Sequence, residues 1–165
     1  MDAVPELAVV VPVKNEAENI LPLLAEIHAA LEQVVAFEVI YVDDGSTDAT
    51  PARLAEACRR YPRLRRVRHR FSCGQSQAIA TAVRLARAPL IAMLDGDGQN
   101  DPADLPAMLA RWRAEPEATR EKLLIAGWRA NRKDTASRRW ASKAANAIRV
   151  ACLKDDTPDT GCGSK

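Results

Sequence analysis

The chain has 165 residues, of which 47% are hydrophobic and 28% charged, and its formal net charge is +2. This length and apolar content predict a single domain with one hydrophobic core. The balanced charge gives no global field that would attract nucleic acid. No apolar run reaches the roughly 18 residues that a membrane-spanning helix needs, and the acidic, proline-containing start is not a signal peptide. The four cysteines lack a metal-ligand spacing, so a reducing, cytoplasmic compartment is expected.

Apolar runs of strand length alternate with helical patterns along most of the chain. Strands are predicted at residues 7–13, 37–42, 64–69, 88–94 and 123–126. Helices are predicted at residues 16–31, 50–61, 75–85 and 102–114. Asn15, with Glu18 three residues later, predicts a capping box at the start of the first helix. After residue 126 this alternation stops.

The alternation predicts an α/β fold, a mostly parallel sheet with helices on both faces. The third strand lies within residues 59–70, which hold seven arginines and no acid. We interpret this run as a charged edge strand with its flanks, and attraction to anionic lipid is the alternative.

Ligands of such sheets bind outside the carboxyl ends of the strands. Residues suited to ligand binding follow each predicted strand in this sequence. They are Asn15 and Glu16, Asp43 and Asp44, Gly74, Asp95 and Asp97, and Arg129. Five loops are therefore expected to face one crevice.

Asp95 and Asp97 follow a buried strand and are separated by a single glycine. Two carboxylates in a glycine-rich loop suit a hard divalent cation that shares its oxygen ligands with substrate phosphates. The alternative is a polar turn that leads into the next helix, with Asp101 and Pro102 at its start. The sequence contains neither a dinucleotide-binding glycine motif nor a P-loop, so a metal is expected to hold the pyrophosphate.

Asp43 and Asp44 suit nucleotide recognition, because a carboxylate accepts hydrogen bonds from a base N–H or a ribose hydroxyl. Pro12 offers a flat apolar face to a base. The alternative for Asp43 to Ser46 is a turn with a helix entry.

Four motifs in this order resemble family 2 glycosyltransferases with the GT-A fold. They are residues 9–16 (VVVPVKNE), 42–48 (VDDGSTD), 74–78 (GQSQA) and 95–99 (DGDGQ). Later residues are similar to the branch that transfers hexoses to polyprenyl or dolichol phosphate, namely Gly127 to Arg129, Arg138, Ser142, Asn146 and Asp159 to Gly163. The resemblance implies one domain over residues 1–165, with a nucleotide-sugar and metal core at 1–127 and an acceptor-binding segment at 128–165. Relatives continue further, so a C-terminally truncated fold is expected.

The resemblance also implies roles for individual residues. The nucleotide sugar would be bound by Pro12, Glu16, Asp43, Asp44, Gly74 and Asp95. Mg2+ or Mn2+ would be bound by Asp95, Asp97 and Gln99. The acceptor phosphate would be bound by Arg129, Arg138 and Ser142, and Asp97 and Arg129 would be catalytic. The sequence departs from the family pattern at Gly98, where relatives often have leucine, and at Trp128, where they have a small residue.

A helix over residues 137–153 would place Arg138, Ser142 and Arg149 on one face, which suits a phosphate. The alternative is a solvated helix face packed on the domain. Trp128 and Trp140 fit a surface at the membrane interface, although a lone tryptophan more often belongs to a core. His28 is expected to be solvated, and His69 ends a strand. Neither histidine is in a catalytic setting, which favours a phosphate acceptor that needs no general base.

The expected function is inverting, metal-dependent transfer of a hexose from a nucleotide diphosphate to a polyprenyl phosphate. The expected location is the cytoplasm, peripheral at the cytoplasmic face of the membrane. One alternative is transfer to a saccharide hydroxyl, with Asp155, Asp156 or Asp159 as base. The other is a truncated nucleotide-binding module with little turnover.

Overall fold

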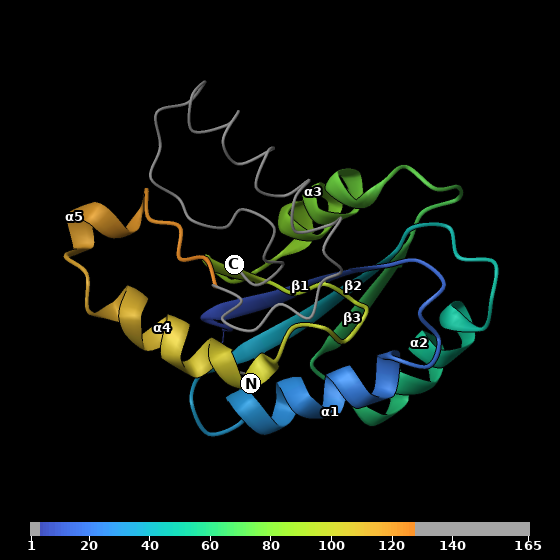
Figure 1. Ribbon diagram of the computed structural model, residues 1–165, viewed down its shortest axis with the longest axis horizontal. Helices are drawn as coiled ribbons and strands as arrows, with labels where there is room; N and C mark the ends of the chain where they lie inside the picture. The colour runs from blue at the N-terminus through green and yellow to red at the C-terminus, as the bar shows by residue number, and fades with distance from the viewer. Residues whose placement is uncertain (1–3, 128–165) are drawn as a thin grey trace, which may run out of the picture. The chain divides into compact units, whose positions relative to one another are not determined.

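Four parallel strands form the sheet of the computed structural model, which describes residues 4–127. The strands are β1 (Leu7–Val13), β2 (Phe37–Asp43), β3 (Leu64–Arg68) and β4 (Leu90–Met93). Their order in the sheet is β3-β2-β1-β4, and every neighbouring pair is parallel (Figure 1). The predicted α/β fold with a parallel sheet is therefore confirmed.

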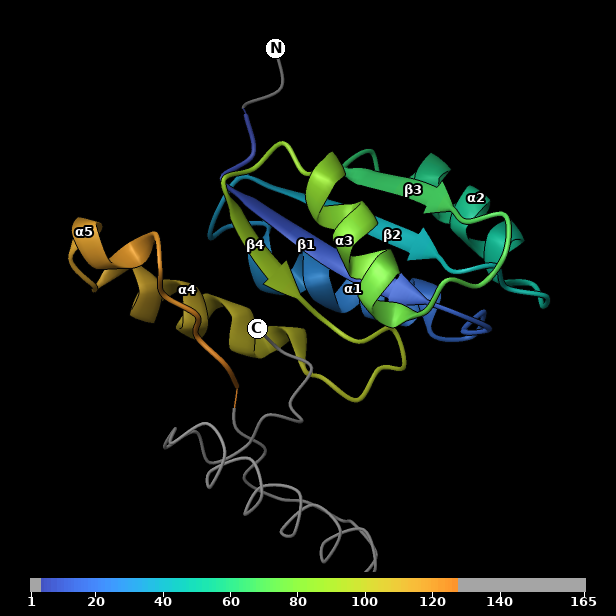
Figure 2. The same cartoon turned by 90° about the horizontal axis from the view of Figure 1, so that it is seen from above.

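Helices cover both faces of this sheet. Helices α1 (Ile20–Leu31) and α2 (Thr50–Arg60) lie on one face, and α3 (Gln75–Leu85) lies on the other (Figures 1 and 2). After β4 come the short 3-10 helix η1 (Pro102–Asp104), α4 (Leu105–Arg113) and the short α5 (Glu117–Arg120). The helices predicted at 50–61, 75–85 and 102–114 are confirmed, while α5 was not predicted.

The core follows the two-residue period of the strands. In β1, Val9 and Val11 belong to the apolar cluster under α1 and α2, whereas Val10 faces α3. On the α3 side the helix contributes Ala78 and Ala82, whose small side chains let its backbone lie close to the sheet. Each large aliphatic side chain buried in this way stabilises the fold by about 1.5–3 kcal/mol.

The arginine-rich strand β3 is an edge of the sheet, as predicted. Its side chains alternate, with Leu64 buried and Arg66 and Arg68 exposed. Arg65 donates to the buried carboxylate of Glu38 on β2 at 2.9 Å. Charge on an edge strand opposes pairing with other chains.

The predicted capping box at Asn15 is wrong, because α1 begins only at Ile20. Asn15 has a left-handed backbone (φ 58°), and its side-chain oxygen accepts the Thr47 N–H at 2.9 Å. Its own N–H donates to Ser46 Oγ at 2.9 Å. Asn15 therefore joins the loop after β1 to the loop after β2 instead of starting a helix.

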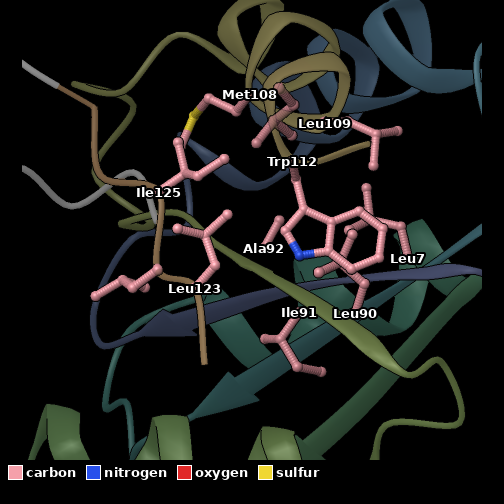
Figure 3. A pocket seen from close by; sticks show the side chains of 11 residues that line it. Leu7, Leu90, Ile91, Ala92, Met108, Leu109, Trp112, Leu123 and Ile125 are labelled. Atoms are coloured by element: carbon pink, nitrogen blue, oxygen red, sulfur yellow. The ribbon is translucent and has the colours of Figure 1, made fainter. Parts of the chain in front are cut away.

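The strand predicted at 123–126 is also absent, since residues 123–127 form no strand in the structure. Leu123 and Ile125 instead border an apolar cavity of about 70 Å³ beside β4 and Trp112 of α4 (Figure 3). An apolar run becomes a strand only where its backbone groups find a partner. In the described part of the chain, the backbone N–H of Leu123 bonds only to the preceding turn, at Arg120 O (3.2 Å).

His28, expected to be solvated, is mostly buried, and its ring centroid lies 5.0 Å from Phe37 and 4.7 Å from Tyr61. Within the described residues, no helix is long and apolar enough to cross a membrane.

Candidate active site

A cavity of about 480 Å³ lies at the carboxyl ends of the strands. This volume falls within the range of roughly 300–1,000 Å³ that is typical of small-molecule sites. Six of the residues that the sequence singles out line it: Pro12, Glu16, Asp44, Gly74, Asp95 and Asp97. Loops that follow different strands thus meet around one space, as the parallel sheet predicts.

Asp44 forms one wall, and four donors hold its carboxylate. Oδ1 accepts from His69 Nδ1 at 2.7 Å and from the Cys73 N–H at 2.8 Å. Oδ2 accepts from Ser72 Oγ at 2.8 Å and from the Gly74 N–H at 2.9 Å. Burial opposes ionisation, but these hydrogen bonds outweigh it and hold the pKa of Asp44 well below its usual range.

His69 stands behind this wall. Because an ionised carboxylate only accepts, His69 Nδ1 carries the proton in its bond to Asp44. Its other nitrogen, Nε2, lies 3.0 Å from Thr81 Oγ1 on α3. This contact was not predicted from the sequence. The available signal was that consecutive strands are usually neighbours in a sheet, so a side chain just after β3 is expected to lie close to one just after β2.

Asp44, His69 and Cys73 also place potential metal-binding atoms within 4.8 Å of one another. The four donors on Asp44 use the roughly four lone-pair sites of a carboxylate. Cys73 Sγ lies 3.4 Å from the Phe71 carbonyl oxygen. We therefore interpret the cluster as a hydrogen-bonded support of the cavity wall, not as a metal centre.

Asp95 and Asp97 form the opposite wall, with Asp95 half-buried and Asp97 exposed. Asp95 Oδ1 accepts from Gln75 Nε2 at 2.8 Å, and Asp97 Oδ1 accepts the Gln99 N–H at 3.0 Å. Within residues 4–127, the second oxygen of each carboxylate receives no hydrogen bond. Two carboxylates that each have one oxygen without a hydrogen bond from these residues suit a hard divalent cation, which takes oxygen ligands.

The glycine between the two acids is required by packing. A Cβ at Gly96 would collide with Val13 Cγ1 and would lie 2.9 Å from the carbonyl oxygen of Pro12. The loop after β4 therefore rests directly on the end of β1, which sets the spacing of Asp95 and Asp97.

The remaining predicted residues lie elsewhere. Asp43 is buried outside the cavity lining, where Oδ1 accepts the Ser46 N–H at 2.8 Å and Oδ2 lies 3.2 Å from Arg68 Nε. The exposed Gln99 side chain is also outside the lining. Arg129, Arg138 and Ser142 lie outside the described residues, and their roles stay predictions.

Five further residues line the cavity that were not predicted: Val13, Lys14, Ser72, Gln75 and Gly96. Lys14 Nζ donates to Ser72 Oγ at 3.1 Å. Each lies within two residues of a predicted one, so proximity along the chain was the available signal. With Glu16, Asp44, Asp95 and Asp97, the lining carries four carboxylates and a single ammonium group.

A parallel sheet with two acids after β4 in the lining of a cavity at the strand ends is the arrangement of a GT-A glycosyltransferase fold. The sequence model of "Glycosyl transferase family 2" matches residues 8–163, and the chain belongs to that family. The resemblance seen in the sequence motifs is thereby confirmed.

Two curated relatives have names that specify a polyprenyl phosphate. The chain is 41% identical over 131 residues to a dodecaprenyl-phosphate galacturonate synthase of Rhizobium johnstonii, covering 78% of this chain and 37% of that protein. It is 35% identical over 158 residues to an undecaprenyl-phosphate 4-deoxy-4-formamido-L-arabinose transferase of Pseudomonas aeruginosa, covering 94% of this chain and 45% of that protein. The chain therefore spans less than half the length of these relatives.

Among solved structures, the fold is similar to a mannosyltransferase from Pyrobaculum calidifontis in complex with GDP-Man and Mn2+. The TM-score is 0.60 and the identity 30%, over 69% of this chain and 34% of the other.

Proposed function

We propose that the protein transfers a sugar from a nucleotide sugar to a polyprenyl phosphate, with inversion at the anomeric carbon and with a divalent cation. The observation that carries this proposal is the meeting of Asp44, Asp95 and Asp97 around one cavity at the strand ends. The names of the two relatives support the lipid phosphate as acceptor. The mannosyltransferase complex supports a nucleotide sugar with Mn2+.

The charge of the cavity supports a cation-dependent donor site. Four carboxylates against one ammonium repel a nucleoside diphosphate, which is itself an anion. Asp95 and Asp97 would hold Mg2+ or Mn2+, with Gln99 as a further oxygen ligand. When bound, the cation supplies Lewis-acid stabilisation of the leaving diphosphate.

Pro12, Glu16 and Gly74 would enclose the nucleotide from the loops after β1 and before α3. Asp44 would act mainly by fixing the loop at residues 72–74, because its oxygens already accept four hydrogen bonds. The base would then meet a rigid wall instead of a free carboxylate.

The acceptor side would belong to residues 128–165, with Arg129, Arg138 and Ser142 binding the phosphate and residues 1–127 forming the donor core. A phosphate monoester is already an anion at neutral pH and attacks without a general base. Neither histidine lines the cavity, which agrees with this choice. The protein would act peripherally at the cytoplasmic face of the membrane, where it would meet the lipid phosphate.

The test is an assay of the 165-residue chain with Mn2+, short polyprenyl phosphate and a panel of radiolabelled nucleotide sugars. We expect label in the organic phase that is lost in Asp97→Asn and kept in Asp104→Asn, an exposed acid outside the cavity lining. Label on an added saccharide would instead indicate a hydroxyl acceptor. Nucleotide binding without any transfer would indicate a binding module.

A further inference from the structure

A short hydrogen-bonded path crosses the cavity from one wall to the other. Because the sheet order is β3-β2-β1-β4, the end of β1 separates Asp44 after β2 from Asp95 after β4. The N–H of Gly74 donates to Asp44 Oδ2 at 2.9 Å. The next residue, Gln75, donates through Nε2 to Asp95 Oδ1 at 2.8 Å. Two consecutive residues at the start of α3 thus connect both walls.

We propose that Gln75 is a positioning residue for the cation: it holds one oxygen of Asp95, so that the other faces the metal. The proposal rests on the cation site under the proposed function and adds a residue to it. Asp95 is half-buried, and within the described residues Gln75 is the only group that orients its carboxylate by a hydrogen bond. Partners that orient a ligating carboxylate in this way typically change metal affinity by about 10–100-fold.

The backbone of Gln75 is held in place by its neighbour Gly74 and by Asp44. The donation of the Gly74 N–H to Asp44 fixes the residue before it, and Gly74 reaches the required backbone with φ +91°. The carboxylate of Asp44 is itself held by three further donors. The amide of Gln75 therefore extends from a rigid support.

A competing role for Gln75 predicts the opposite change in metal affinity. If the Gln75 amide occupied the place of the cation, it would have to leave before the metal binds. Its removal would then raise metal affinity. Under the positioning role, its removal lowers affinity.

The experiment is a titration of the 165-residue chain with Mn2+, in which electron paramagnetic resonance measures the concentration of the free ion. We expect Gln75→Met to weaken Mn2+ binding by about 10–100-fold. Gln77→Met is the matched control, because Gln77 is an exposed glutamine on the same helix that does not line the cavity. It should bind Mn2+ like the wild type, and both variants should keep the wild-type unfolding temperature.

A double-mutant cycle separates positioning from a general structural effect. In an Asp95→Asn background, Gln75→Met should lower the Mn2+ affinity by less than about threefold, since the carboxylate that Gln75 orients is gone. An equal cost in both backgrounds overturns the proposal, as does unchanged or tighter Mn2+ binding by Gln75→Met alone. A wild-type chain that binds no Mn2+ overturns the cation site of the proposed function, and this role with it.

Discussion

His69 Nδ1 lies 2.7 Å from Asp44 Oδ1, although 25 residues separate the two along the chain. They meet because β2 and β3 are parallel neighbours, and the His69 N–H continues their ladder by donating to Asp43 O at 2.8 Å. On its far side His69 contacts Thr81 of α3. One wall of the cavity is therefore braced by β2, β3 and α3 together.

Replacing Asp44 with asparagine should destabilise the fold. Asparagine offers one acceptor oxygen and an NH2 group, so it cannot accept from all four donors, two of which are the N–H groups of Cys73 and Gly74. Donors left without an acceptor cost about 1–3 kcal/mol each when buried, and because these hydrogen bonds are only partly buried, a total loss of about 1–2 kcal/mol is expected. Urea unfolding measures it, with Asp104→Asn as the control. A loss below about 0.5 kcal/mol would show that the loop does not depend on this carboxylate.

The same carboxylate should make stability depend on pH in the acid range. Because the pKa of Asp44 is lower in the folded protein than in the unfolded chain, its contribution is present above about pH 4 and is lost as the pH falls below that. The difference in unfolding free energy between wild type and Asp44→Asn should therefore shrink from pH 6 to pH 3. Urea titrations at several pH values test this, and a constant difference would contradict it.

Local pattern was sufficient for much of this fold. Helix α3 begins and ends where its apolar spacing predicts, and β1 is bounded by the ends of its own apolar run. The strand-end rule placed Asp44, Asp95 and Asp97 around one cavity without any contact information. These features depend on short-range periodicity and on the handed, parallel topology that follows from it.

Residues whose role depends on distant partners could not be predicted. Asn15 has the sequence context of a helix cap, but its side chain accepts a hydrogen bond from Thr47 in the loop after β2. The run at 123–126 has the composition of a strand but lacks a strand partner among the described residues. Gln75 stands in a motif that the sequence analysis singled out, yet its contact with Asp95 depends on where α3 lies over β1.

Gly96 should tolerate no side chain. In Gly96→Ala the new methyl group would collide with Val13 Cγ1 and crowd the carbonyl oxygen of Pro12, so either β1 or the acidic loop must shift. Overpacking of this kind costs about 1–3 kcal/mol, and Mn2+ affinity should fall with it. Adding Val13→Ala removes the collision with the Val13 side chain and should recover part of the loss. Wild-type stability and Mn2+ affinity in Gly96→Ala would show that the loop does not rest on β1.

Lys14 should matter for the diphosphate and not for the fold. Its ammonium is the single positive group among the residues that line the cavity, and it is exposed and donates through Nζ to Ser72 Oγ. Lys14→Met should weaken binding of a nucleoside diphosphate by about 3–10-fold with Mn2+ present, because an exposed charge contributes on the order of 1 kcal/mol. The effect should fall as salt rises from 20 to 500 mM, since the ammonium is exposed and is screened. Calorimetry with UDP and GDP measures both trends, and Lys122→Met, an exposed lysine outside the cavity lining, is the control. A loss that is independent of salt would mean that Lys14 shapes the loop through Ser72 and does not act through its charge.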